Sequence, residues 1–263
     1  MEKRKGARSM KDIPTTILEQ LNRGEIESAN LTEWLAIDKL LLVENVLTDL
    51  KRTAYIPIVL DGIADLKKVT ANTINQSVGY TLYQLSEEKG DKELFGLLKN
   101  HKSDSVRCWA TYFIQNNQEM TISDKLSAIK DFAGDKHFGV REISWMAVRQ
   151  DIIENLEESL ILLKEWTKDK NENIRRFASE ATRPRGVWAT HITELKANPS
   201  LALPILEALK ADSSKYVRDS VGNWLNDVAK DNPIFVQEVC KEWMKGNDSK
   251  ETAYIVKKGT RNV

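Results

Sequence analysis

Hydrophobic residues recur at helical spacing along nearly the whole chain. Apolar positions at i, i+3, i+4 and i+7 predict amphipathic helices, whereas no stretch bounded by turn residues alternates apolar and polar positions as a strand would. The pattern therefore predicts an all-α protein. The expected helices cover residues 14–22, 30–50, 55–67, 71–88, 91–100, 104–116, 123–133, 138–150, 155–168, 172–182, 189–197, 201–210, 215–230 and 233–245.

Four of these segments begin with the same short motif. A valine or isoleucine followed by arginine stands at Val106-Arg107, Val140-Arg141, Ile174-Arg175 and Val217-Arg218. The motifs lie 34, 34 and 43 residues apart, and a weaker copy near Ile74 lies 32 residues before the first. A period of this size in helical sequence is typical of stacked helix pairs. We therefore expect an α-solenoid of HEAT-like antiparallel helix pairs.

An aspartate precedes the last three motifs by five residues in each case. These aspartates, Asp135, Asp169 and Asp212, stand where one repeat meets the next. We expect them to form an Asp–Arg ladder with Arg141, Arg175 and Arg218 between the helix ends of neighbouring repeats. The motif arginines are therefore predicted to be structural.

Length and charge fit one elongated domain. The chain has 263 residues with 41% hydrophobic content, which is enough to bury a sizeable core. We expect a single HEAT-like domain at residues 13–263, preceded by a basic N-terminal arm at residues 1–12. The 39 basic and 39 acidic side chains balance, which argues against a general polyanion-binding coat but permits a segregated basic groove.

Several function classes lack their sequence signatures. No apolar run approaches the roughly 20 residues that span a bilayer, and none follows the basic arm as in a secretory signal. Cys108, Cys240 and the three histidines show no disulfide or zinc pattern. No Gly-rich phosphate loop and no GxSxG elbow occurs. We expect a reduced, cytoplasmic monomer with no metal or organic cofactor and no membrane partner.

The longest interval between motifs contains an unusual loop, residues 182–188, which reads T-R-P-R-G-V-W. Pro184 ends the preceding helix, because proline disfavours helical geometry in the residue before it. A structural joint needs only one proline or glycine. Arg183, Arg185 and Trp188 at the rim of the stack therefore indicate a functional surface.

Charged side chains gather on one side of consecutive helices. If the Val or Ile of each motif lies in the core and each residue advances about 100°, offsets 2, 6, 9, 10 and 13 face away from it. Glu142, Glu180 and Asp227 then fall within about 80° of one another on their helices. This pattern alone fits either a solvated charged face or a site. The cations at these offsets include Arg149, Arg176, Arg183 and Lys230.

Trp145 stands at offset 5, on the polar side of its helix and between two arginines. A tryptophan in this place is harder to explain as core than one on the apolar stripe. It is predicted either to pack between repeats or to contact a ligand.

Two long segments carry a family resemblance. Residues 174–188 read I-R-R-F-A-S-E-A-T-R-P-R-G-V-W, and residues 216–233 read Y-V-R-D-S-V-G-N-W-L-N-D-V-A-K-D-N-P. Together with the N-terminal K-G-A-R-S-M-K-D-I-P and N-L-T-E-W-L-A-I-D, they resemble the bacterial AlkC-type alkylpurine DNA glycosylases, HEAT-like repeat enzymes related to the AlkD type. The resemblance covers most of the chain. It implies a monofunctional DNA repair glycosylase that hydrolyses the N-glycosidic bond of positively charged alkylated bases, chiefly 3-methyladenine, in double-stranded DNA.

The resemblance also implies site residues. Glu180, Trp188 and Asp227 match positions of the family's active-site region. The chain departs from the family at residues 144–150, S-W-M-A-V-R-Q, where many relatives read S-E-F-A-x-R-P. The relatives' glutamate aligns with Trp145, and Glu142, one turn earlier on the helix, is the candidate to supply the missing carboxylate.

An N3-alkylated purine is already cationic, so it leaves as a neutral base without a strong general acid. The protein must then stabilise the sugar cation and activate water. We assign this catalytic role to Asp227 or Glu180, with Glu142 as an auxiliary negative charge. Trp188 and Trp145 are predicted to contact the cationic base or the sugar. Phosphates that flank the lesion are assigned to Arg149, Arg176, Arg183, Arg185 and Lys230.

Two other functions fit the same sequence. One is a relative that binds unusual DNA structures without glycosylase activity, which the departure at Trp145 favours. The other is a non-catalytic HEAT scaffold that grips a protein partner. A scaffold would not require the carboxylates and the 182–188 loop to converge.

Overall fold

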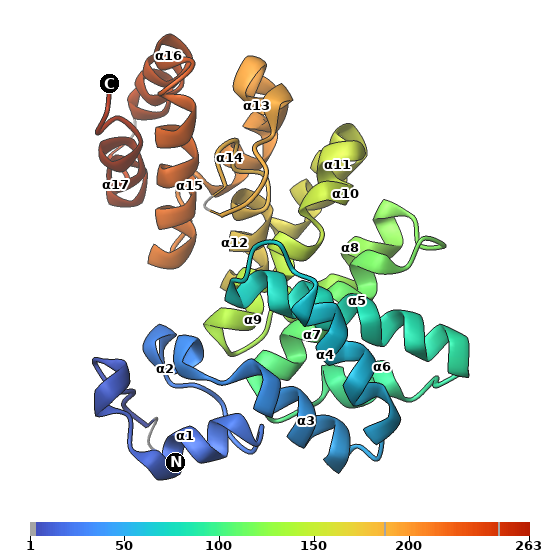
Figure 1. Ribbon diagram of the computed structural model, residues 1–263. Coiled ribbons are helices and arrows are strands. Elements are labelled where there is room, and N and C mark those ends of the chain that lie inside the picture. The colour runs from blue at the N-terminus through green and yellow to red at the C-terminus, as the bar shows by residue number, and fades with distance from the viewer. Residues whose placement is uncertain (1–3, 187, 247) are drawn as a thin grey trace. The chain divides into compact units, whose positions relative to one another are not determined.

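Helices make up all the regular structure in the described part of the chain. The computed structural model describes residues 4–186, 188–246 and 248–263 (Figure 1). Lys3 of the predicted basic arm therefore lies outside the described residues. None of the helices in these ranges is long and apolar enough to cross a membrane. Contacts group the chain into two compact units, residues 1–119 with 135–147, and residues 120–134 with 148–263.

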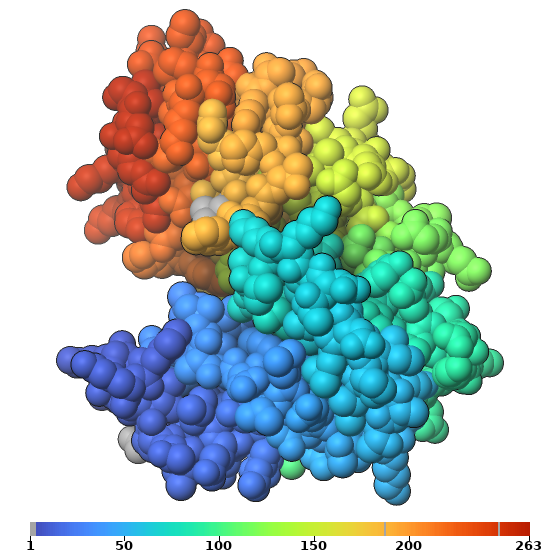
Figure 2. Space-filling model, viewed as in Figure 1, coloured from blue at the N-terminus to red at the C-terminus, as the bar shows by residue number. Residues whose placement is uncertain are grey.

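The first unit stacks helices from successive repeats. Within it, α7 packs against both α5 and α9, and the residues of α7 from Asp104 to Ile114 are buried. Figure 2 shows the blue segments from α1 to α3 as one continuous surface. The elements of this unit are η1 (Met10–Asp12), α1 (Thr15–Asn22), α2 (Leu31–Ala36), α3 (Lys39–Asp49), η2 (Thr53–Tyr55), α4 (Ile56–Ala64), α5 (Ala71–Lys89), α6 (Leu94–Lys99), α7 (Asp104–Asn116) and α9 (Phe138–Ala147).

The second unit follows the same plan. Here α15 packs against both α12 and α17, so helices of successive repeats again stack on one another. This is the arrangement that the repeat period predicts. The elements of this unit are α8 (Ile122–Ala133), α10 (Arg149–Glu154), α11 (Leu156–Trp166), α12 (Glu172–Glu180), α13 (Thr193–Ala197), η3 (Pro199–Ala202), α14 (Leu203–Leu209), α15 (Lys215–Val228), α16 (Pro233–Met244) and α17 (Lys250–Gly259).

The predicted helix at residues 30–50 is wrong in one respect, because it is two helices. The backbone of Ile37 is extended, and α3 starts anew after Asp38. The Asp38 carboxylate accepts hydrogen bonds from the backbone N–H groups of Leu40 and Leu41, at 3.0 and 3.1 Å. A side chain that satisfies the first N–H groups of a helix favours a new start at that point. The predicted helix at 138–150 is likewise divided, into α9 and α10.

Helix α17 lies beyond the last predicted helix. Ser249 caps it by accepting a hydrogen bond from the Thr252 N–H, and Ile255 is fully buried. At Gly259 an added Cβ would lie 2.8 Å from the Leu225 Cβ, so the backbone of α17 packs directly on α15. Tertiary packing of this kind stabilises short helices whose own sequence signal is weak.

The predicted Asp–Arg ladder is confirmed in part. Arg175 pairs with Asp212, whereas Asp135 pairs with Arg107 of the preceding repeat and Asp169 pairs with Lys130. Arg107 donates to Asp135 from Nε at 2.8 Å and from Nη2 at 3.0 Å. Arg175 donates to Asp212 in the same way, at 2.6 and 2.9 Å. Both arginines also donate to backbone carbonyls of the loop before their own helix. Each paired guanidinium therefore ties two repeats together at their helix ends.

Candidate functional site

Glu180 and Asp227 come together in the second unit, joined by Arg183. Glu180 is the last residue of α12 and Asp227 lies near the end of α15, and these two helices pack on each other. Arg183 donates from Nη1 to Glu180 Oε1 at 2.8 Å and from Nε to Asp227 Oδ2 at 2.8 Å. The predicted convergence of carboxylates from separate repeats is confirmed for this pair.

Glu180 is buried with both carboxylate oxygens engaged. Its Oε2 accepts a hydrogen bond from Ser220 Oγ at 2.7 Å and lies 3.4 Å from Arg176 Nη2. Burial alone would raise the pKa of Glu180, but the charges of Arg176 and Arg183 outweigh it and hold the pKa below its ordinary value. Glu180 is therefore a fixed negative charge at neutral pH.

Asp227 is as buried as Glu180, but only one of its carboxylate oxygens, Oδ2, accepts hydrogen bonds from Arg183. Nε and Nη2 of Arg183 both lie 2.8 Å from Asp227 Oδ2, whereas Lys230 Nζ lies 4.0 Å from Oδ1. Among the described residues, none donates a hydrogen bond to this Oδ1. Burial raises the pKa of Asp227 in spite of the opposing Arg183 charge. A carboxylate with one oxygen held, the other open and a raised pKa is suited to take a proton from water.

Arg149 is a buried cation in contact with the loop that follows α12. Its Nε, Nη1 and Nη2 donate to the backbone carbonyls of Thr190, Ala181 and Arg183, at 3.0, 2.6 and 2.5 Å respectively. Burial lowers the pKa of Arg149 to about 10, so the guanidinium is still charged at neutral pH.

The helical projection is wrong about which side these residues face. It places Glu180, Arg183, Asp227 and Arg149 away from the core, yet their exposed fractions are only 4, 8, 4 and 2%. They are buried because the charges pair with one another across repeats and with loop carbonyls, which a single-helix projection does not represent.

Trp188 is by contrast 88% exposed, and its backbone has φ +64°. A left-handed backbone costs a residue with a side chain about 1–2 kcal/mol, so it is uncommon for a bulky one. Val187 lies outside the described residues. Trp188 is therefore an exposed tryptophan with a strained backbone, in the same loop as Arg183.

Three of the predicted phosphate-binding cations keep part of their side chains at the surface. Arg176 stacks over the Tyr216 ring at 4.4 Å, and Arg185 forms a two-pronged pair with Asp231 at 2.7 and 3.1 Å. The exposed fractions of the Arg176, Arg185 and Lys230 side chains are 11, 29 and 47%. Lys230 is therefore the most open of the three.

Glu142 and Trp145 lie on α9 in the first unit and bond to each other. Trp145 Nε1 donates to Glu142 Oε2 at 2.9 Å, and Trp145 is 1% exposed. Its predicted place on the polar side of the helix is therefore wrong, because the indole is core and Glu142 satisfies its N–H group. To contact a base, Trp145 would first have to leave this core.

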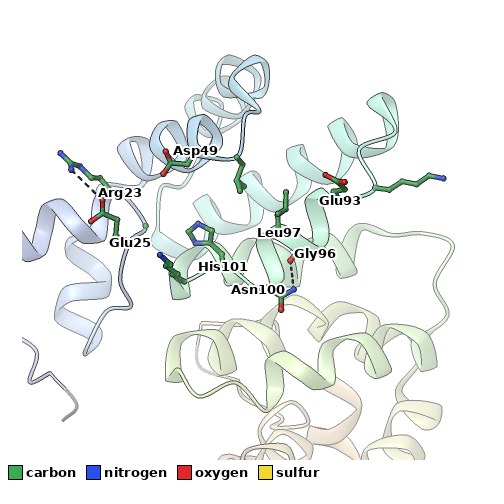
Figure 3. A pocket seen from close by; sticks show the side chains of 12 residues that line it. Arg23, Glu25, Asp49, Glu93, Gly96, Leu97, Asn100 and His101 are labelled. Atoms are coloured by element: carbon green, nitrogen blue, oxygen red, sulfur yellow. Dashed lines mark hydrogen bonds and ion pairs between the residues drawn. The ribbon is translucent and has the colours of Figure 1, made fainter. Parts of the chain in front are cut away.

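A pocket of about 820 Å³ lies in the first unit, where the ends of α1 and α3 meet α6 (Figure 3). His101 is part of its lining, and burial lowers the pKa of this imidazole. The lining mixes both signs of charge, with Arg23, Lys92 and Lys102 beside Glu25, Asp49 and Glu93. None of the predicted site residues belongs to it.

Residues 140–261 match the family model of the DNA alkylation repair enzymes. The Glu180–Arg183–Asp227 cluster and Arg149 all lie within this segment. A sequence relative, the uncharacterized protein YhaZ of Bacillus subtilis (strain 168), is 41% identical over 120 residues, which are 46% of this chain and 33% of that protein. The chain thus matches one third of the length of this curated relative.

Solved structures also resemble this chain. The alkylpurine DNA glycosylase AlkC of Pseudomonas fluorescens, solved bound to DNA containing an abasic site analog, is 26% identical with a TM-score of 0.69, covering 85% of this chain and 62% of that chain. AlkD2 from Streptococcus mutans is 25% identical with a TM-score of 0.62, covering 80% of this chain and 99% of that chain. The predicted all-α class of HEAT-like helix pairs is confirmed by this likeness. Together with the family model over residues 140–261, this makes the chain similar to the DNA alkylation repair proteins of the AlkC and AlkD types.

Proposed function

We propose that this chain is a DNA glycosylase that hydrolyses the N-glycosidic bond of cationic alkylated bases, chiefly 3-methyladenine, in double-stranded DNA. The observation that carries the proposal is the pair of buried acids, Glu180 and Asp227, which share Arg183 and whose pKa values move in opposite directions. Two nearby acids with separated pKa values are suited to two different roles in one reaction. The likeness to AlkC, an alkylpurine DNA glycosylase solved with DNA, supports the choice of substrate.

In the proposed reaction, the bond between C1′ of the sugar and the base nitrogen breaks, and its electron pair goes to the purine. Because the alkylated purine is already cationic, it leaves as a neutral molecule. The oxygen of a water bonds to C1′, and Oδ1 of Asp227 takes the proton of that water. Glu180 provides a fixed negative charge that favours the cationic sugar. The nucleophile is water, so the enzyme is monofunctional and the step requires no metal or organic cofactor.

Cations and an aromatic ring are assigned to hold the DNA. Arg176, Arg185 and Lys230 bind phosphates that flank the lesion without reading sequence. Trp188 faces the cationic base, where a cation–π contact contributes about 0.5–2 kcal/mol and favours the charged lesion over its neutral parent. Arg149 and Arg183 are buried and donate to loop carbonyls and carboxylates inside the protein, so the proposal gives them no phosphate. We propose that the protein acts on bacterial DNA as a monomer in the cytoplasm.

The test is base release from alkylated duplex DNA. The wild-type protein is expected to release 3-methyladenine in preference to 7-methylguanine, with unalkylated duplex as the control. With three phosphate contacts, log K for duplex binding should fall with log salt at a slope of about −3. Duplex binding without base release would favour the DNA-structure-binding alternative. If no duplex binds even at low salt, the scaffold alternative takes its place.

Replacing Trp188 by glycine is expected to raise the stability of the protein and to lower its rate of base release. The left-handed backbone strains tryptophan by about 1–2 kcal/mol, whereas the extra unfolded-state entropy of glycine costs about 0.5–1 kcal/mol. The free energy of unfolding in urea should therefore rise by up to about 1 kcal/mol. Release of 3-methyladenine should fall about tenfold because the cation–π contact is lost. A less stable variant, or one with unchanged base release, contradicts the assignment.

A further inference from the structure

We propose that Arg149 is a positioning residue for the same site. It fixes the backbone of the loop residues 181–186 and 188–190, so that Arg185 and Trp188 are held in one arrangement. This inference rests on the proposed function for its meaning. It gives Arg149 a role other than a contact with phosphate, since the residue is 2% exposed.

The acceptors of Arg149 lie at both ends of the loop. Ala181 follows the last residue of α12, where helix carbonyls lack partners within the helix. Arg149 donates to the carbonyls of Ala181 and Arg183 at the start of the loop and to that of Thr190 at its end. Its charge is also favourable at this C-terminal end of a helix. One guanidinium therefore holds the beginning and the end of the loop together.

Other donors complete the set. Trp224 Nε1 donates to the Thr182 carbonyl at 2.9 Å, and the Ile192 N–H donates to the Pro184 carbonyl at 3.0 Å. The four successive carbonyls from residue 181 to residue 184 are thus all hydrogen-bonded. A segment whose carbonyls all accept hydrogen bonds from buried donors has one preferred backbone conformation.

The close approach of Gly186 is an independent sign of this role. A Cβ added at Gly186 would lie 3.2 Å from Arg149 Nη2, which is tighter than an ordinary van der Waals contact. The loop backbone therefore passes directly against the guanidinium. A larger residue at position 186 would have to displace one or the other.

Arg149 also acts on the acids through Arg183. Its Nη2 holds the carbonyl of Arg183, whose own guanidinium spans Glu180 and Asp227. A change at residue 149 should consequently reach both the exposed tryptophan and the buried acids. Lysine cannot replace this arrangement, because an ammonium is a point charge that lacks the planar fork needed for three separate acceptors.

The first test measures the loop itself. Trypsin cuts after arginine but poorly before proline, so within residues 181–190 the Arg185–Gly186 bond is its site. Arg149→Lys is expected to speed cleavage at this bond about tenfold, because loss of charge-assisted hydrogen bonds raises local opening. Gly186→Ala should act in the same direction without a change of charge. Arg175→Lys is the matched control, since Arg175 also binds backbone carbonyls but not those of this loop.

The second test measures the effect on the reaction. Arg149→Lys is expected to lower 3-methyladenine release about tenfold. This loss should be smaller in a Trp188→Ala background, where only the part of the effect that passes through Arg183 to the two acids remains. A loss of equal size in both backgrounds, or wild-type cleavage rates after Arg185, would overturn the inference. If the wild-type protein releases no base, the proposed function fails, and the trypsin result with its Arg175→Lys control still decides whether Arg149 shapes the loop.

Discussion

Asp227→Asn is expected to lower the single-turnover rate of 3-methyladenine release by about 10²–10³-fold, because the variant lacks the base that takes the proton of water. Asparagine has nearly the same shape and still offers an oxygen to Arg183 Nε, so the loop and the cluster should persist. Affinity for duplex DNA should stay within about threefold of wild type, since Asp227 contacts no phosphate in the proposal. An undiminished rate would remove Asp227 from catalysis.

The pH dependence of the rate separates the two acids. Asp227 must be ionised to act, so the rate should fall as pH drops through its pKa, which burial raises above the ordinary aspartate value. Glu180 has a lowered pKa and stays ionised over that range. Glu180→Gln should therefore reduce the rate without removing the acid limb. If the fall of the rate at low pH persisted in Asp227→Asn, a group other than Asp227 would take the proton of the water.

Much of the helical framework is predictable from the sequence because it is set by local and periodic features. The 34-residue recurrence of the Val-Arg motif locates α7, α9 and α12, and the predicted segment 104–116 coincides with α7. The division at Asp38 was harder to foresee, since residues 31–49 are apolar at helical spacing on both sides of it. Helix α17 depends on its contact with α15, which no local pattern contains.

At the candidate site too, contacts between residues distant in the sequence could not be predicted from it. Sequence comparison with a family pointed to Glu180 and Asp227, and both lie in one cluster. The burial of Arg149 was missed because its partners are backbone carbonyls, which the sequence does not display. Ser220 was missed as well, although a hydroxyl at a core offset of α15 is a usable signal. Its Oγ donates a hydrogen bond to Glu180, so this polar atom in the core stabilises the buried carboxylate.

Arg183→Met is expected to lower the free energy of unfolding by about 3–5 kcal/mol at pH 7, because it leaves two buried carboxylates without their shared cation. Arg185→Met is the matched control. Its pair with Asp231 is nearer the surface, and its loss should cost at most about 1 kcal/mol.

The size of the Arg183→Met effect should itself depend on pH, and the sign follows from the pKa shifts. In the wild type the pKa of Glu180 is lowered, so its contribution to stability is present above the unfolded value and is lost as pH falls through the folded one. Without Arg183, the pKa of Asp227 should rise further, and the pKa of Glu180 should rise to a smaller extent because Arg176 remains beside it. The folded variant then gains stability as these groups take up protons. Urea unfolding at pH 7 and pH 4 should therefore show a large gap between wild type and variant that narrows in acid. An equal gap at both pH values would mean that Arg183 stabilises the protein through its packing and not through the two carboxylates.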